Sequence, residues 1–233
     1  MPGRVLFPTT SFTTDDLVSV YQDLAPVLIP HLADRPVTLK RFPDDIHGEA
    51  FWEKDAPDFT PAWIERLGVP RKHERSVMDY MSITSVEALR WAASMGCIEI
   101  HPFLHRYPFI TSPTLIALDL DPGPGRTILD CCAVALDVRR WFERWEMESS
   151  AKVSGSKGMQ VFVPLNTPCS YSATQAIARA VAEDLHGRTP DRVTSQMAHG
   201  ERVKKIFKNG LSLDRRDDRS PFPTRSISAR FIS

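Results

Sequence analysis

Two aspartates separated by a single residue are the groups in this sequence best suited to binding metal ions. Asp119 and Asp121 follow the apolar run Leu115–Leu118, which predicts a strand with both carboxylates on one face. Two carboxylates held this close repel each other unless a cation lies between them. Oxygen ligands suit Mg²⁺ or Mn²⁺, and two such ions can stabilise the attacking and leaving oxygens of phosphoryl transfer. The alternative is a helix cap or a solvated turn.

A glycine-containing loop, Ser154 to Gly158, is a second candidate for phosphate chemistry. Its glycines let backbone N–H groups approach an anion, its serines add hydroxyl donors, and Lys157 adds a positive charge. The spacing is not that of a Walker A loop. A hairpin turn that enters the following apolar strand is the competing interpretation.

Three further residues have side chains that could contact a nucleotide or DNA. His101 ends the apolar run that starts at Cys97, where a histidine is either structural or functional. Phe51 and Trp52 lie in a polar, proline-rich stretch, and they can either stack on bases or pack onto the core. These alternatives stay open on residue type alone.

Composition places the chain among ordinary globular proteins without a nucleic-acid signature. The 233 residues include 29 basic and 29 acidic side chains, so any contact with nucleic acid must come from local clusters such as Lys40-Arg41. The four cysteines have neither metal-binding nor disulfide spacing. No apolar run approaches the roughly 20 residues that span a bilayer. We expect a cytoplasmic protein without a membrane partner.

Periodicity predicts helices and strands in alternation, and hence an α/β or α+β layered domain. Helices are expected after a polar turn at Thr13–Asp16 up to Pro30, after Thr84, after the Asp119–Asp121 strand and after Ser172, with a short one at 63–67. Strands are expected at 36–42, 115–121 and 161–163.

In their order along the chain, these segments resemble the polymerase domain of bacterial DNA ligase D, in the archaeo-eukaryotic primase superfamily. The resemblance covers nearly the whole chain. The segments that carry it most specifically are Gly96–Pro102, Leu118–Gly123 and Ser154–Gly158. It implies a primase-polymerase core with a central, largely antiparallel sheet flanked by helices. We expect residues 1–233 to form one such domain, shorter at the C-terminus than the family's.

The resemblance also implies a role for each candidate residue. Asp119 and Asp121 would be catalytic and would hold two Mn²⁺ or Mg²⁺ ions together with residue 209. The nucleoside triphosphate, a ribo- or deoxyribonucleotide, would contact His101, Ser154, Lys157, Arg202 and Arg230. DNA ends with a templating strand would contact Lys40, Arg41, Phe51, Trp52 and Lys54. A separate ATP-dependent DNA ligase and Ku are the implied partners in non-homologous end joining.

One departure from the family pattern leaves the activity open. The family has a third metal-binding aspartate where this chain has Asn209, which keeps an oxygen ligand but lacks the charge, next to Lys208. Three hypotheses follow: an active nucleotidyltransferase, a weakened or inactive module that binds DNA ends or nucleotides, and an unrelated metal-dependent phosphohydrolase.

Overall fold

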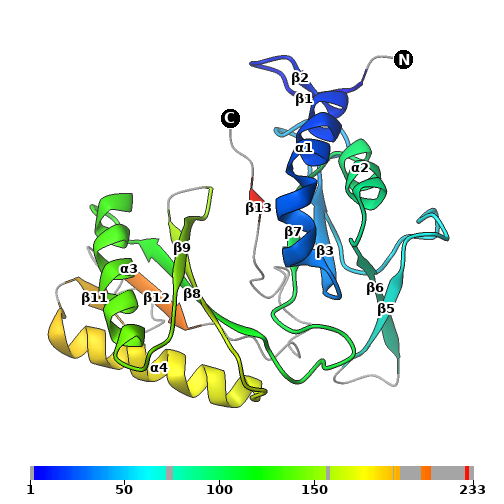
Figure 1. Cartoon of the computed structure of the whole chain (residues 1–233). Coiled ribbons are helices and arrows are strands. Elements are labelled where there is room, and N and C mark those ends of the chain that lie inside the picture. The colour runs from blue at the N-terminus through cyan, green and yellow to red at the C-terminus, as the bar shows by residue number, and fades with distance from the viewer. Residues whose placement is uncertain are drawn as a thin grey trace. The chain divides into compact units, whose positions relative to one another are not determined.

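The chain forms two compact units, each with its own sheet and its own hydrophobic core (Figure 1). The computed structural model describes residues 3–71, 76–155, 158–190, 192–194, 206–210 and 229–230, with the backbone alone for 194, 206–210 and 229–230. Unit 1 comprises the described residues up to 110 together with β13, and unit 2 comprises those from 111 to 210. The predicted mixture of helices and largely antiparallel sheets is confirmed, although the strands form two main sheets.

Unit 1 is built on an antiparallel sheet with the strand order β13-β7-β3-β6-β5, and β4 also pairs with β3. The strands of this sheet are β3 (Pro36–Arg41), β4 (Phe51–Glu53), β5 (Arg66–Pro70), β6 (Val77–Ser82), β7 (Cys97–Pro102) and β13 (Ala229–Arg230). A separate two-stranded sheet pairs β1 (Val5–Phe7) with β2 (Phe12–Thr13). Helices α1 (Thr14–Leu32) and α2 (Val86–Ser94) lie side by side (Figure 1). Their apolar faces and that of the sheet form one buried cluster.

Local signals explain where the helices of unit 1 begin. Thr13 caps α1, where its hydroxyl accepts a hydrogen bond from the Asp16 N–H and the Asp16 carboxylate accepts one from the Thr13 N–H. The predicted start of α2 at Thr84 is one residue early, because Ser85 accepts the hydrogen bond from Ala88 N–H.

Two predictions for unit 1 are wrong. Helix α1 continues past Pro30 to Leu32, because the Ala33 N–H still donates to Ile29 O and the Arg106 guanidinium donates to Pro30 O and Ala33 O. The predicted short helix at 63–67 is absent, since residues from Arg66 onward pair with β6 as strand β5. Tertiary pairing overrides local propensity in this segment.

Unit 2 is a five-stranded sheet with the order β11-β12-β8-β10-β9, in which only β11 and β12 run parallel. The strands are β8 (Leu115–Pro122), β9 (Ser150–Val153), β10 (Met159–Pro164), β11 (Val193–Thr194) and β12 (Ile206–Gly210). Helices α3 (Ile128–Glu143) and α4 (Tyr171–Arg188) pack on the apolar face of the sheet. Helix α4 begins at Ser170, whose hydroxyl accepts from Ala173 N–H, rather than at the predicted Ser172.

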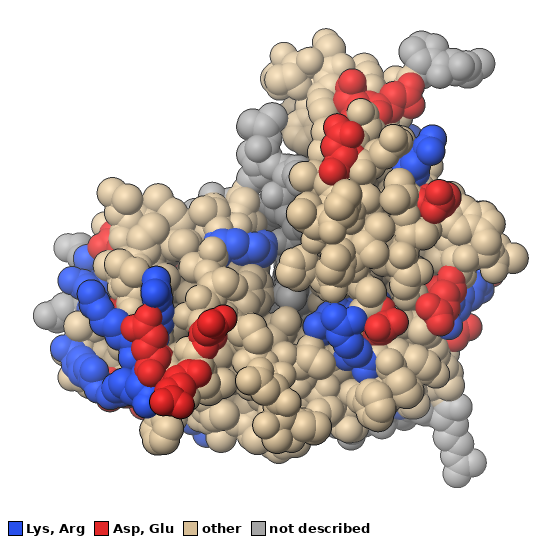
Figure 2. Space-filling view, in the orientation of Figure 1, with Lys and Arg blue, Asp and Glu red and all other residues tan. Residues whose placement is uncertain are grey.

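Charged side chains on the α3 and α4 side of unit 2 alternate in sign. In the region that these helices occupy, Figure 2 shows basic and acidic groups interspersed, and Arg139–Glu143, Arg140–Asp137 and Arg188–Asp184 form ion pairs there. Such solvated pairs contribute little to stability, and within each pair the two charges offset each other's field. None of the helices in the described part of the chain has the length and apolar character needed to cross a membrane.

Candidate active site

Strand β8 presents its two aspartates on the face of the unit 2 sheet that the helices do not cover. Along β8 the residues alternate between buried and half-buried. Ile116, Leu118 and Leu120 are fully buried against α3 and α4, whereas Asp119 and Asp121 are half-buried on the opposite face. The alternation predicted from the sequence is therefore present.

Asp119 has an amide-bearing residue on each side in the sheet. Gln160 of β10 and Asn209 of β12 both lie directly opposite Asp119 in antiparallel register. Directly opposite residues project from the same face with Cβ atoms about 4.5–5.5 Å apart. The backbone register thus places three oxygen-bearing residue types in one row across three strands, with Phe207 opposite Asp121 in the next row.

Gln160 is a residue of this row that sequence analysis missed. Its side chain is buried, and its Oε1 atom has no hydrogen-bond partner among the described residues. A buried acceptor without a partner costs on the order of 1–3 kcal/mol, which a bound cation or donor would offset. The sequence offered one signal for this residue, namely its position two residues after Gly158, because residues two apart on a strand lie on the same face.

The glycine loop closes directly against Asp121. The Ser154 N–H donates to Gly158 O at 2.9 Å, and the Gly158 N–H donates to Ser154 Oγ at 3.3 Å. A Cβ atom on Gly158 would lie 2.5 Å from Leu120 O and 2.9 Å from Asp121 Oδ1. Only glycine fits this contact, so Ser154 and the carboxylates are brought together. Lys157 lies outside the described residues.

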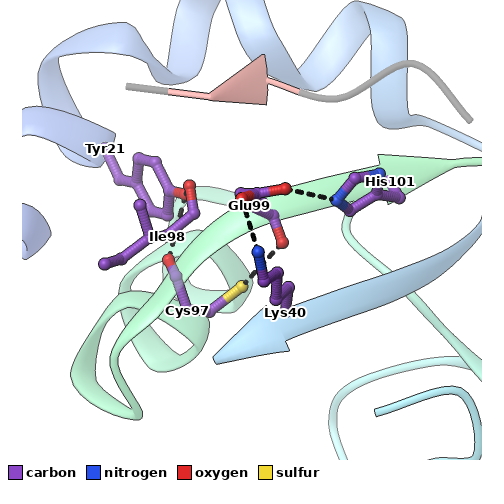
Figure 3. A network of polar contacts seen from close by, with 6 residues as sticks. All are labelled: Tyr21, Lys40, Cys97, Ile98, Glu99 and His101. Carbon is purple, nitrogen blue, oxygen red and sulfur yellow. Dashed lines mark hydrogen bonds and ion pairs between the residues drawn. The ribbon is translucent and has the colours of Figure 1, made fainter. Parts of the chain in front are cut away.

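Unit 1 contains a second cluster of the predicted residues, centred on a buried carboxylate (Figure 3). Glu99 Oε1 lies 3.0 Å from Lys40 Nζ, and Glu99 Oε2 lies 3.0 Å from His101 Nε2. Glu99 is 4% exposed and His101 is 7% exposed. Burial acts to raise the pKa of Glu99, but hydrogen bonds from His101 and Lys40 and their charges outweigh it and lower the pKa to about 2.

Aromatic side chains of β4 border this cluster. The Trp52 ring lies 5.0 Å from the His101 ring between centroids, and Lys40 Nζ lies 5.2 Å from the centroid of Trp52. Phe51 is 45% exposed, and the Arg41 guanidinium lies 5.5 Å from its centroid. Four of the five residues predicted to bind DNA therefore contact one another or the histidine, and the fifth, Lys54, follows directly after β4.

The remaining predicted residues lie in the C-terminal part of the chain. Arg202 is outside the described residues. Arg230 belongs to β13, and its backbone lies directly opposite Glu99 in register. The structure thus assembles Asp119, Asp121, Asn209 and Ser154 within unit 2 by contact or by register. It assembles the other group within unit 1, namely Lys40, Arg41, Phe51, Trp52, His101 and Arg230.

No three His, Cys, Asp or Glu side chains in the described portion of the chain are grouped so that they could hold a metal ion. The candidate ligand set therefore consists of two carboxylates with amide oxygens beside them. This set is hard and oxygen-rich, as Mg²⁺ and Mn²⁺ sites are.

Comparison with known proteins gives a consistent result over most of the chain. Residues 13–212 match the model of the family described as "LigD, primase-polymerase domain". The chain is 36% identical over 208 residues to the multifunctional non-homologous end joining protein LigD of Mycolicibacterium smegmatis, and this match covers 88% of the chain. It is 26% identical over 209 residues to the bifunctional LigD of Bacillus subtilis, again over 88% of the chain.

The fold agrees with a solved structure of the same domain. The polymerase domain of Mycobacterium tuberculosis ligase D, in complex with DNA, superimposes with a TM-score of 0.84 at 31% identity. The match covers 89% of this chain and 74% of that domain. The chain spans only 27% of the length of the M. smegmatis relative and 32% of the B. subtilis one. On the family match and these similarities, the chain belongs to the LigD primase-polymerase domain family.

Proposed function

We propose that this chain is a nucleotidyltransferase that adds ribo- or deoxyribonucleotides to DNA 3′ ends during non-homologous end joining, guided by a templating strand. The observation that carries the proposal is the placement of Asp119 and Asp121 on the face of the unit 2 sheet opposite α3 and α4, with the glycine loop closing against Asp121. Membership of the LigD primase-polymerase domain family supports the same reaction class.

The residues present fit a pair of divalent cations. Asp119, Asp121 and Asn209 would hold two Mn²⁺ or Mg²⁺ ions, which supply Lewis-acid stabilisation of phosphoryl oxygens when bound. The buried Oε1 of Gln160, which has no hydrogen-bond partner among the residues that the structure describes, lies beside Asp119 and adds support for a cation at this place. The protein's own contribution is the fixed geometry: strand alternation sets the spacing of the carboxylates, and Gly158 allows the loop to approach them.

Nucleotide and DNA are assigned to different residues in the proposal. Ser154, Lys157, Arg202, His101 and Arg230 would contact the nucleotide. A hydroxyl donor at the loop entrance and cationic side chains are suited to phosphate oxygens. Lys40, Arg41, Phe51, Trp52 and Lys54 would contact the DNA end, because exposed aromatic rings stack on bases and basic groups follow the backbone. The DNA in the M. tuberculosis structure supports a DNA ligand for this chain.

Asn209 supports a second candidate function. A site with two carboxylates binds divalent cations more weakly than a site with three, and the backbone register puts an asparagine rather than an aspartate directly opposite Asp119. The second candidate is a module of the same fold that binds DNA ends or nucleotides with little or no catalysis. A separate ATP-dependent DNA ligase and Ku remain proposed partners, and a cytoplasmic location remains a prediction.

Primer extension on a gapped duplex separates these functions. Each reaction contains Mn²⁺ and one of the four NTPs or dNTPs. We expect the primer to be extended only when that nucleotide is complementary to the template base. Binding of the gapped duplex without extension, at any metal concentration, would favour the binding module. Release of phosphate from nucleotides without any need for DNA would indicate a hydrolase instead.

A further inference from the structure

Glu99 is a buried carboxylate shared by two basic side chains, and the proposed function assigns it no role. Its Oε1 lies 3.0 Å from Lys40 Nζ and its Oε2 lies 3.0 Å from His101 Nε2 (Figure 3). The Lys40 side chain is 20% exposed, whereas those of Glu99 and His101 are 5% and 9% exposed. Glu99, the least exposed of the three side chains, is therefore the one that pairs with both Lys40 and His101.

The backbone around Glu99 is fixed from two sides. The fully buried Tyr21 hydroxyl of α1 lies 3.0 Å from Cys97 O and 3.1 Å from Ile98 O, which ties β7 to the helix. Strand pairing places Lys40 directly opposite Glu99 on one side, while Arg230 is directly opposite it on the other. Glu99 consequently has little freedom to move away from its partners.

The position of the hydrogen bond defines which nitrogen of His101 changes its protonation state. The pKa of Glu99 is lowered to about 2, because the hydrogen bonds and charges of its partners outweigh its burial, so the carboxylate is ionised at every physiological pH. It can only accept a hydrogen bond, and Nε2 therefore carries a proton. Nδ1 is left as the atom at which His101 gains or loses its charge.

Several charged and titratable side chains of the described residues interact with Glu99. Burial, and then the charges of Cys97 and Glu99, raise the pKa of Tyr21, so it stays neutral, and burial raises the pKa of Cys97 as well. Among the described side chains, those that interact with the carboxylate are Lys40 of β3, Tyr21 of α1, and Cys97 and His101 of β7, while the backbone of Arg230 of β13 lies opposite Glu99. Of these described side chains, Glu99 is the only anion at neutral pH.

We propose that Glu99 is a positioning residue that holds His101 in its doubly protonated form and oriented beside Lys40, so that His101 meets the triphosphate of the incoming nucleotide as a cation. This inference rests on the proposed function, because it takes His101 as a nucleotide contact. A neutral imidazole would present a lone pair at Nδ1 to a polyanion, whereas the imidazolium presents an N–H donor.

The sign of the pH dependence follows from this arrangement. The ionised carboxylate favours the charged imidazole, so nucleotide affinity is high at low pH and falls as pH rises through the pKa of His101. In Glu99→Gln the carboxylate is lost while Lys40 stays positive. The charged imidazole is then disfavoured, and the fall in affinity moves to lower pH.

The test is a histidine titration by NMR on the whole chain, combined with nucleotide kinetics. His101 is assigned by the signal that disappears in His101→Asn. We expect Glu99→Gln to lower the half-protonation pH of His101 by at least one unit, and to raise the nucleotide KM at pH 8 about tenfold with less than a twofold change in DNA Kd. Glu53→Gln is the matched control, because it removes the neighbouring carboxylate, which pairs with Arg41 at 2.6 Å. Glu53→Gln should leave the titration of His101 unchanged.

A second variant keeps the proposal testable should Glu99→Gln fail to fold. Lys40→Met removes the competing cation, so the half-protonation pH of His101 should rise. An unchanged or lower value in Lys40→Met, or an unchanged value in folded Glu99→Gln, overturns the role of Glu99 whatever the enzyme does. Predicted shifts in a chain that extends no primer would support the positioning role while contradicting the proposed function. Failure of the positioning role of Glu99 and failure of the proposed function are thus distinguishable.

Discussion

Asn209 lies directly opposite Asp119 in the antiparallel register of β12 and β8. The two residues are 90 positions apart in the sequence, yet strand pairing makes them neighbours on one face of the sheet. An aspartate at position 209 would add a carboxylate beside the two on β8. An asparagine supplies an oxygen ligand without the charge, in a site that we propose holds divalent cations close to a triphosphate.

Asn209→Asp should therefore increase activity. We expect at least a tenfold gain, which corresponds to about 1.4 kcal/mol of transition-state stabilisation. The gain should be largest with Mg²⁺, which requires near-ideal octahedral ligation, and the unmodified chain should work mainly with Mn²⁺. Metal titrations of both proteins on one gapped substrate measure this. Full Mg²⁺ activity in the unmodified chain, unaffected by the substitution, would show that two carboxylates suffice.

Asp121→Ala should abolish primer extension and leave the fold intact. Asp121 is half-buried at the end of β8, so its removal relieves repulsion with Asp119 and should raise the melting temperature slightly in the absence of metal. Asp137→Ala is the control, because it removes a carboxylate of α3 that pairs with Arg140 on the surface. The control should extend primers at the normal rate. Unaltered extension by purified Asp121→Ala would end the assignment of this site.

Lys157→Ala should raise the nucleotide KM much more than it weakens DNA binding. Lysine in the glycine loop would contact phosphates that belong only to the incoming nucleotide. Steady-state kinetics and a DNA-binding titration, done on the same preparation, separate the two effects. A parallel loss of DNA affinity would assign Lys157 to the DNA surface instead.

Gly158→Ala should reduce both stability and activity, since the new Cβ would lie 2.5 Å from Leu120 O and 2.9 Å from Asp121 Oδ1. The strand and loop must separate, at a cost of about 1–3 kcal/mol. Gly187→Ala in α4 is the matched control, because nothing lies within 4 Å of its added Cβ. It should stabilise the chain by about 0.5–1 kcal/mol without affecting extension. Urea unfolding and primer extension check both, and a Gly158→Ala chain as stable and active as the original would refute the contact.

The local sequence was sufficient to predict those features whose geometry depends only on residues close together in the chain. The alternation that places Asp119 and Asp121 on one face depends only on residues 115–122, and it was predicted correctly. Periodicity predicted a layered α/β or α+β domain, and the resemblance added one central, largely antiparallel sheet flanked by helices, whereas the strands form two main sheets. The glycine loop was identified from its composition, but its contact with Asp121 required the pairing of β8 with β10.

Long-range pairing explains what the sequence did not reveal. Gln160 has an ordinary polar side chain within an apolar strand, and only the pairing of β10 with β8 shows that it lies beside Asp119. Glu99 is two residues from His101 on β7, so alternation places both on one face, but its ion pair with Lys40 depends on the pairing of β7 with β3. The proline at position 30 predicted a helix end because the compensating donors of Arg106 are 76 residues away. The segment at 66–70 became a strand because β6 was available as its partner.

The most direct test of the central claim is single-nucleotide incorporation at a one-nucleotide gap, with each of the four template bases in turn and Mn²⁺ present. We predict that the nucleotide complementary to the template is added to the 3′ end and that Asp121→Ala adds none. Incorporation that ignores the template base, or that persists in Asp121→Ala, would contradict the claim that this chain is a templated nucleotidyltransferase acting through Asp119 and Asp121.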